Sequence, residues 1–145
     1  MKRAFAFALA VGVAGILATV GSATPRSGAL HVTKECSQYT ATAGSYCTIT
    51  TSNINTIRPG SRVVYASGAN FLTGVLDSDL VIDGPGNNNA YGHVVLNLAT
   101  FTGTVRFSGG TGEFSHFHTG PLAVACPAYP VCSWDGPYSF QAGRG

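Results

Sequence analysis

The stretch GTVRFSGGTGEFSHFHT, residues 103–119, decides the fold class of this chain. Polar and apolar side chains alternate on both sides of a glycine-rich centre: Val105 and Phe107 alternate with Thr104, Arg106 and Ser108, and Phe114, His116 and His118 alternate with Ser115 and Phe117. Alternation with a period of two is typical of β-strands, and glycines accept the positive φ of a tight connection. The stretch therefore predicts a β-hairpin that turns at Gly109, Gly110 and Gly112.

Similar runs recur along the rest of the chain, which has 145 residues. β-branched and aromatic residues cluster between Gly, Pro, Asn and Asp, and no long window has apolar residues at helical spacing. The expected strands are residues 31–36, 45–51, 61–67, 79–83, 92–98, 103–108, 113–119, 121–125 and 133–140. A hydrophobic content of 45% with only 10% charged residues suits a packed core rather than a disordered chain. The sequence predicts one all-β domain.

The N-terminal residues have the composition of a cleavable export signal. Lys2 and Arg3 precede an apolar run over residues 4–20, and small residues follow at positions 21–23. An uncleaved membrane anchor is the alternative, but an apolar run rich in Ala and Gly is short for a span of roughly 20 residues. We expect a signal peptide at residues 1–23, cleavage after Ala23, and a secreted or periplasmic domain at residues 24–145.

The charge balance changes once the expected signal peptide is set aside. Residues 24–145 contain six Lys and Arg against six Asp and Glu, and the cations do not cluster. A row of phosphates or an anionic membrane surface attracts proteins that carry such a cluster. We therefore expect neither nucleic acid nor, after signal cleavage, a membrane as a partner, and we leave the oligomeric state open.

Four cysteines lie in residues 24–145, at positions Cys36, Cys47, Cys126 and Cys132. An even number in an exported chain predicts two disulfides, for which three connectivities exist. We favour Cys36 with Cys47 and Cys126 with Cys132, because each pair brackets turn-forming residues. Separations of 11 and 6 positions do not match the close pairs of zinc sites, which disfavours a zinc site.

Asp79, His93 and His116 are the candidate catalytic residues. Asp79 with either histidine would form a general acid–base pair if both faced one cavity, because desolvation there raises the pKa of a carboxylate. The alternative is that Asp79 caps the turn ahead of the polar loop that follows. His93, His116 and His118 resemble a metal-binding trio, and Asp77, Asp79 and Asp83 a calcium-binding one, but surface and turn roles explain both groups more simply. We expect no metal and no cofactor.

Trp134, Tyr138 and Phe140 alternate along the last expected strand. Such aromatic residues usually close a barrel core, and a platform on which a ligand stacks is the alternative. In that alternative His118, Trp134 and Tyr138 are the ligand-binding residues.

Three segments resemble a known superfamily. Residues 77–81 (DSDLV) ahead of a Gly/Pro/Asn loop, a strand that contains Gly92, and residues 107–114 (FSGGTGEF) are similar to the dirigent and allene oxide cyclase proteins, and above all to exported bacterial members of that superfamily. The resemblance implies an eight-stranded antiparallel β-barrel, in which residues 121–125 merge with a neighbouring strand. It implies that Asp79 faces the barrel cavity, and that the cavity can hold a small apolar ligand.

Two hypotheses of different classes follow. The first is an exported barrel that binds a small apolar molecule. In one form of this hypothesis the barrel is also an enzyme, with cyclase-like or isomerase-like chemistry that needs no cofactor. The second is a non-catalytic secreted interaction module with a filled barrel. A cavity of roughly 300 Å³ or more lined by Asp79 and a histidine would favour the first hypothesis. An interior filled with Phe and Leu side chains would favour the second.

Overall fold

The computed structural model describes residues 25–141, so the expected signal peptide at residues 1–23 lies outside the described part. The described residues form nine β-strands and one short 3₁₀ helix, η1 (Gly112–Phe114), without any α-helix. The strands are β1 (Ser27–Glu35), β2 (Tyr46–Ser52), β3 (Arg62–Tyr65), β4 (Val75–Asp83), β5 (Asn89–Asn97), β6 (Thr102–Gly110), β7 (His118–Thr119), β8 (Leu122–Ala128) and β9 (Val131–Ser139). The prediction of an all-β domain is confirmed. Within residues 25–141, no helix has the length and apolar character that crossing a membrane requires.

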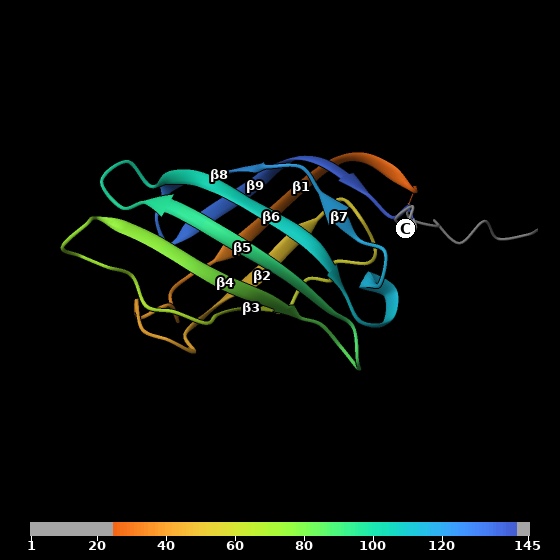
Figure 1. The fold of residues 1–145 in the computed structure, drawn as a ribbon, viewed down its shortest axis with the longest axis horizontal. Coiled ribbons are helices and arrows are strands. Elements are labelled where there is room, and N and C mark those ends of the chain that lie inside the picture. Colours follow the sequence, from red (N-terminus) through yellow and green to blue (C-terminus); the bar gives the residue numbers. More distant parts are fainter. Residues whose placement is uncertain (1–24, 142–145) are drawn as a thin grey trace, which may run out of the picture.

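The strands close into an antiparallel barrel (Figure 1). Each strand from β1 to β6 pairs with the next in sequence, and β9 returns to pair with the whole of β1, from Ser27 opposite Ser139 to Glu35 opposite Val131. β8 pairs with both β6 and β9 and so completes the ring. Closure satisfies the backbone groups that an open sheet would leave at its edges. The predicted eight-stranded barrel is confirmed, with β7 as an additional short strand.

β7 and β8 lie one after the other between β6 and β9. Ser108 of β6 pairs with His118 of β7, whereas residues 102–105 of β6 pair with β8. β9 likewise pairs with β7 through its last residues and with β8 through its first ones. The two strands therefore share one position in the ring, as the merging of residues 121–125 with a neighbour anticipates.

Residues 113–119 do not form the strand that alternation predicts, and this part of the hairpin prediction is wrong. Residues 112–114 form η1, and only His118 and Thr119 are extended. Phe114 and Phe117 are both buried, at 1% and 0% exposure. The N–H of Phe117 donates to the carbonyl of Phe114 at 3.0 Å and closes a further turn after η1. Residues three apart in such a turn lie on the same side, which explains why both rings reach the core.

Of the three glycines expected in the turn, Gly109 and Gly112 have the positive φ that was expected, whereas Gly110 is required for a different reason. Gly109 and Gly110 belong to β6 rather than to a turn, although Gly109 has a φ of +121°. A Cβ on Gly110 would lie 1.9 Å from the carbonyl oxygen of Asn89, so glycine permits the close approach of β5. Gly112 does have a positive φ of +58°, and a Cβ there would lie 2.1 Å from Asn88 Oδ1.

Both predicted disulfides are present, Cys36–Cys47 and Cys126–Cys132. They lie at one end of the barrel, which we call the disulfide end and which is bounded by loops 36–45, 66–74, 98–101 and 129–130. The opposite end, which we call the aromatic end, is bounded by segments 53–61, 84–88 and 111–117. In Figure 1 the disulfide end is on the left and the aromatic end on the right.

The aromatic end is filled by side chains. Its core includes Phe107, Phe114, Phe117, Trp134 and Tyr138, all of them buried. The ring of Phe107 lies 5.4 Å from that of Trp134 and 5.6 Å from that of Phe117, measured between centroids. Phe114 packs edge-on against Phe117 at 5.4 Å. These distances are in the range of favourable aromatic pairs, so this half of the interior is a packed core.

Candidate functional site

The interior of the disulfide end contains a cavity of about 480 Å³. It is walled by inward-facing strand residues, by both disulfides and by loop residues: Lys34, Cys36, Tyr39, Thr40, Ala41, Cys47, Tyr65, Ala69, Phe71, Leu76, Val94, Leu96, Leu98, Phe101, Val124, Cys126, Tyr129 and Cys132. Phe71, Phe101 and Tyr129 are 77%, 39% and 50% exposed, so the cavity reaches the surface at its rim. Its volume lies within the range of roughly 300 to 1,000 Å³ that is typical of small-molecule sites.

Lys34 is the one charged residue among the buried side chains of residues 25–141. β1 places it inside, because Leu30, Val32 and Lys34 alternate with outward-facing residues along the strand. Its Nζ donates a hydrogen bond to the Tyr65 hydroxyl and lies 4.7 Å from the ring centroid of Trp134. No carboxylate lines the cavity, and Lys34 takes part in no ion pair within the described residues.

Burial sets the protonation of this group. Desolvation lowers the pKa of Lys34 from 10.5 to about 7, because the apolar surroundings disfavour the charged ammonium. The same burial raises the pKa of Tyr65, with a smaller contribution from Tyr39. The pair is therefore a phenol and an amine whose neutral form is well populated at neutral pH.

Two tyrosine hydroxyls in this part of the cavity wall have few hydrogen-bond partners. The Tyr39 hydroxyl is buried and has no hydrogen-bond partner among the described residues, and the Tyr39 ring packs edge-on against Tyr65 at 5.0 Å. Among the described residues, the hydrogen-bond partners of the Tyr65 hydroxyl are Lys34 Nζ and, at 3.6 Å, Cys47 Sγ. Sulfur is a weak acceptor, so the wall leaves phenol protons for an acceptor group.

Asp79 lies on the outside of the barrel, not in the cavity. Along β4, Ser78 and Leu80 point inward, which places Asp77 and Asp79 outward with 66% and 81% of their side chains exposed. Asp79 lies within the strand, so the turn-cap interpretation is also wrong. The implication that Asp79 faces the cavity is wrong, because the alternation of β4 fixes the opposite face.

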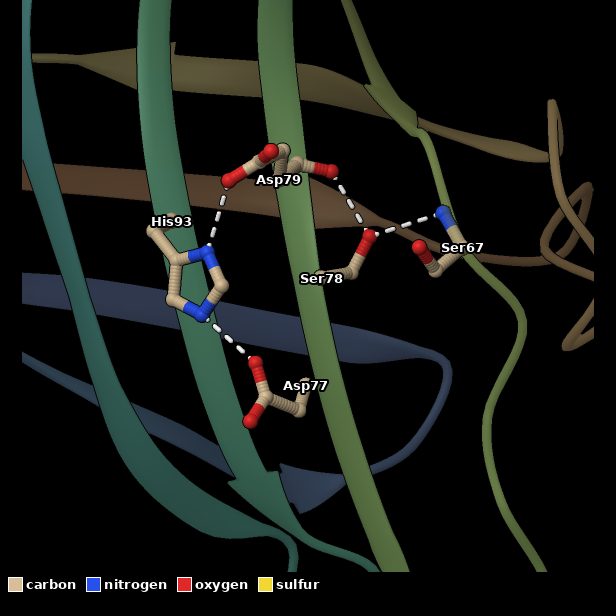
Figure 2. A network of polar contacts seen from close by, with 5 residues as sticks. All are labelled: Ser67, Asp77, Ser78, Asp79 and His93. Atoms are coloured by element: carbon tan, nitrogen blue, oxygen red, sulfur yellow. Dashed lines mark hydrogen bonds and ion pairs between the residues drawn. The ribbon is translucent and has the colours of Figure 1, made fainter.

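The predicted partnership of Asp79 with His93 does form, on that outer surface (Figure 2). His93 Nδ1 is 2.7 Å from Asp79 Oδ1, and its Nε2 is 2.6 Å from Asp77 Oδ1. The hydrogen bond to Asp79 raises the pKa of His93, opposed by desolvation and aided by Asp77. Since all three side chains are about half exposed or more, the cluster lacks the desolvation that acid–base catalysis was expected to use.

The other histidines do not join this cluster. His116 is exposed between η1 and β7, and His118 is exposed on β7. Within residues 25–141, no group of three or more His, Cys, Asp or Glu side chains is arranged to hold a metal ion. Asp83 ends β4 and is exposed.

Trp134 and Tyr138 belong to the packed interior rather than to the cavity wall. Trp134 is fully buried and Tyr138 is 5% exposed, and neither lines the cavity. Trp134 nevertheless touches both halves, since its ring packs on Phe107 and lies beneath Lys34 Nζ. The core interpretation of these aromatic residues is therefore the one that the structure supports.

Lys34 is not among the site residues predicted above, although the sequence contains a pattern that indicates its burial. The residues 30, 32, 34 and 36 share one face of a strand, and three of them are Leu, Val and Cys. A lysine on an otherwise apolar face is unusual, because buried lysines are rare without a partner.

Comparison of the chain with protein-family models, curated proteins and solved structures finds no match.

Proposed function

We propose that this protein binds a small, mainly apolar molecule in the cavity of the disulfide end, and that it does so outside the cytoplasm. The observation that carries the proposal is the cavity of about 480 Å³ whose largely apolar wall contains a few polar side chains, among them the hydrogen-bonded pair Lys34 and Tyr65. Sites for small molecules combine apolar walls with a few polar groups that orient the ligand. Two disulfides support an oxidising compartment.

The sequence predicts that a ligand-binding barrel would have a large cavity lined by Asp79 and a histidine, and this prediction is met only in part. The cavity exceeds the size threshold, but Lys34 and tyrosines line it in place of Asp79 and a histidine. The filled aromatic end is the observation that favours the alternative, a non-catalytic interaction module. The closed barrel is compatible with the resemblance to dirigent and allene oxide cyclase proteins, whereas the outward position of Asp79 departs from it. We place the ligand in the hollow half.

A matched pair of variants on β5 tests the proposal. Leu96 lines the cavity, whereas the preceding residue, Val95, points outward and is 42% exposed. Leu96→Trp should fill the cavity and weaken the binding of a neutral apolar probe, such as decanol, by about tenfold or more, as a pocket that loses its free volume does. Val95→Trp adds the same ring outside and should leave binding unchanged. NMR titration with decanol measures both, and equal affinity of the wild type and both variants would reject binding in this cavity.

A further inference from the structure

Lys34 Nζ is an unusual amine for three reasons that do not depend on one another. It lies in an apolar cavity at 3% exposure, no acidic side chain of the described residues pairs with it, and a hydroxyl group is hydrogen-bonded to it. An ordinary surface lysine has none of these features, because its ammonium is solvated. The surroundings favour the neutral amine, which is a nucleophile.

The groups around the amine suit a neutral acceptor. Tyr65 and Tyr39 supply hydroxyl protons, and no charged side chain other than Lys34 lines the cavity. A carbonyl oxygen is an acceptor without charge, so it could use these protons without adding a buried ion. The volume of the cavity leaves room for an apolar substituent on the carbonyl carbon.

We infer that Lys34 captures an apolar aldehyde or ketone as a reversible imine. The inference deepens the proposed function and rests on it, because the same cavity must first admit the apolar part of the ligand. It adds a covalent step and a named chemical class. The rim residues Phe71, Phe101 and Tyr129 would surround the apolar substituent toward the mouth.

The step is balanced without any further reactant. The nitrogen lone pair of the neutral amine attacks the carbonyl carbon, a C–N bond forms, and the carbonyl oxygen gains a proton to give a carbinolamine. Loss of that oxygen as water, with two hydrogens that derive from the amine, gives the C=N bond. Tyr65 is placed to donate a proton to the oxygen and to accept one from nitrogen, since its hydroxyl already contacts Nζ. Hydrolysis reverses each step and releases the ligand.

The acidity of the amine agrees with this chemistry. The pKa of Lys34, lowered by burial to about 7, makes roughly half of the amine neutral at pH 7, whereas an exposed lysine is almost wholly protonated there. The other titratable groups that line the cavity are Tyr39 and Tyr129 from the loops and Tyr65 from β3. The pKa values of Tyr39 and Tyr65 are raised, so both retain their protons near pH 7.

The sequence offers a clean experiment, because Lys34 is the only lysine in residues 24–145. The protein is incubated with decanal and sodium cyanoborohydride at pH 7, and peptide mass spectrometry follows reductive alkylation. Arg106→Lys supplies the matched control, since position 106 is exposed on β6 and outside the cavity wall. Lys34 should react about tenfold or more faster than the substituted position 106, from the difference in neutral fraction. Lys34→Met should abolish the fast adduct, and Tyr65→Phe should slow it.

Three outcomes would overturn the inference. If decanol binds but decanal modifies position 106 as fast as Lys34, the imine is wrong and the proposed function stands. If decanoate binds more tightly than decanol, depends on Lys34, and decanal gives no fast adduct, the amine serves a carboxylate instead. If neither decanol nor decanal binds to the cavity, the proposed function itself fails, and the imine with it.

Discussion

The two ends of the barrel share most of their strands, yet one end is packed and the other is hollow. At the aromatic end, rings from β6, β9 and the segment around η1 meet within 5.4 to 5.6 Å of one another. At the disulfide end, two disulfides tie adjacent segments together around a cavity. A hollow interior buries less apolar surface, and covalent links compensate for part of that loss. Inward and outward residues alternate at both ends, so the size of the inward side chains decides whether the interior is filled or hollow.

The largest loss of stability is expected when an inward side chain is truncated at the packed aromatic end. A truncation at the hollow disulfide end serves as the comparison. Phe107→Ala should lower the free energy of unfolding by about 3 to 5 kcal/mol, because it removes a ring from a packed core. Leu96→Ala should cost less, about 1 to 2 kcal/mol, because Leu96 is only partly buried and already borders a cavity, so fewer of its atoms lose contacts. Urea unfolding measures both changes. Equal losses would mean that the two ends do not differ in packing.

Lys34→Met should give the next largest effect, and it should stabilise the protein. The pKa of Lys34 is about 7 in the folded chain and 10.5 in the unfolded one, so between these pH values the unfolded state binds more protons. The free energy of unfolding therefore rises with pH across that window in the wild type. Below pH 7 the buried charge costs its full amount, on the order of 2 to 5 kcal/mol.

Lys34→Met should remove that cost and flatten the pH dependence from pH 7 to 10.5, as urea unfolding at several pH values would measure. Arg106→Met removes a charge of the same sign from the outer surface and should change stability by less than about 0.5 kcal/mol. A wild-type stability that stays constant from pH 7 to 10.5 would contradict the burial of an ammonium at this site.

The fold was predictable from the sequence wherever alternation persisted. The strands expected over 31–36, 45–51 and 92–98 correspond to β1, β2 and β5. Their limits agree within one residue, except that β1 and β5 begin a few residues earlier than expected. The failure at 113–117 has a local cause, since the apolar residues Phe114 and Phe117 are three apart while a histidine between them imitates a period of two. Short segments that combine both spacings do not distinguish a strand from a 3₁₀ turn.

The candidate site was less predictable, because it depends on register. Asp79 pairs opposite His93, so their partnership follows from adjacent antiparallel strands, but the face they share is decided by Leu80 and its inward neighbours. The resemblance to a known superfamily implied the opposite face. Lys34 could have been found from the face of β1 alone, whereas its contact with Tyr65 depends on β2 pairing with both β1 and β3 and so bringing the two strands to the same wall.

The smallest effect is expected on the outer surface, where Asp79→Asn separates the two faces of β4. Because the hydrogen bond to Asp79 raises the pKa of His93 above 6.5, the ion pair stabilises the folded chain fully below pH 6.5 and loses its effect as the pH rises through the raised value. Asp79→Asn should therefore lower the pKa of His93 toward its ordinary value and cost less than about 1 kcal/mol, since exposed ion pairs are screened by solvent. NMR titration of the His93 ring measures the first effect, and urea unfolding at pH 5.5 and pH 8.5 measures the second. Decanol binding should not change, because Asp79 and the cavity lie on opposite sides of the strand wall. A loss of decanol binding with an unchanged His93 titration would show that Asp79 belongs to the ligand site. The inward and outward faces of β4 would then be assigned wrongly.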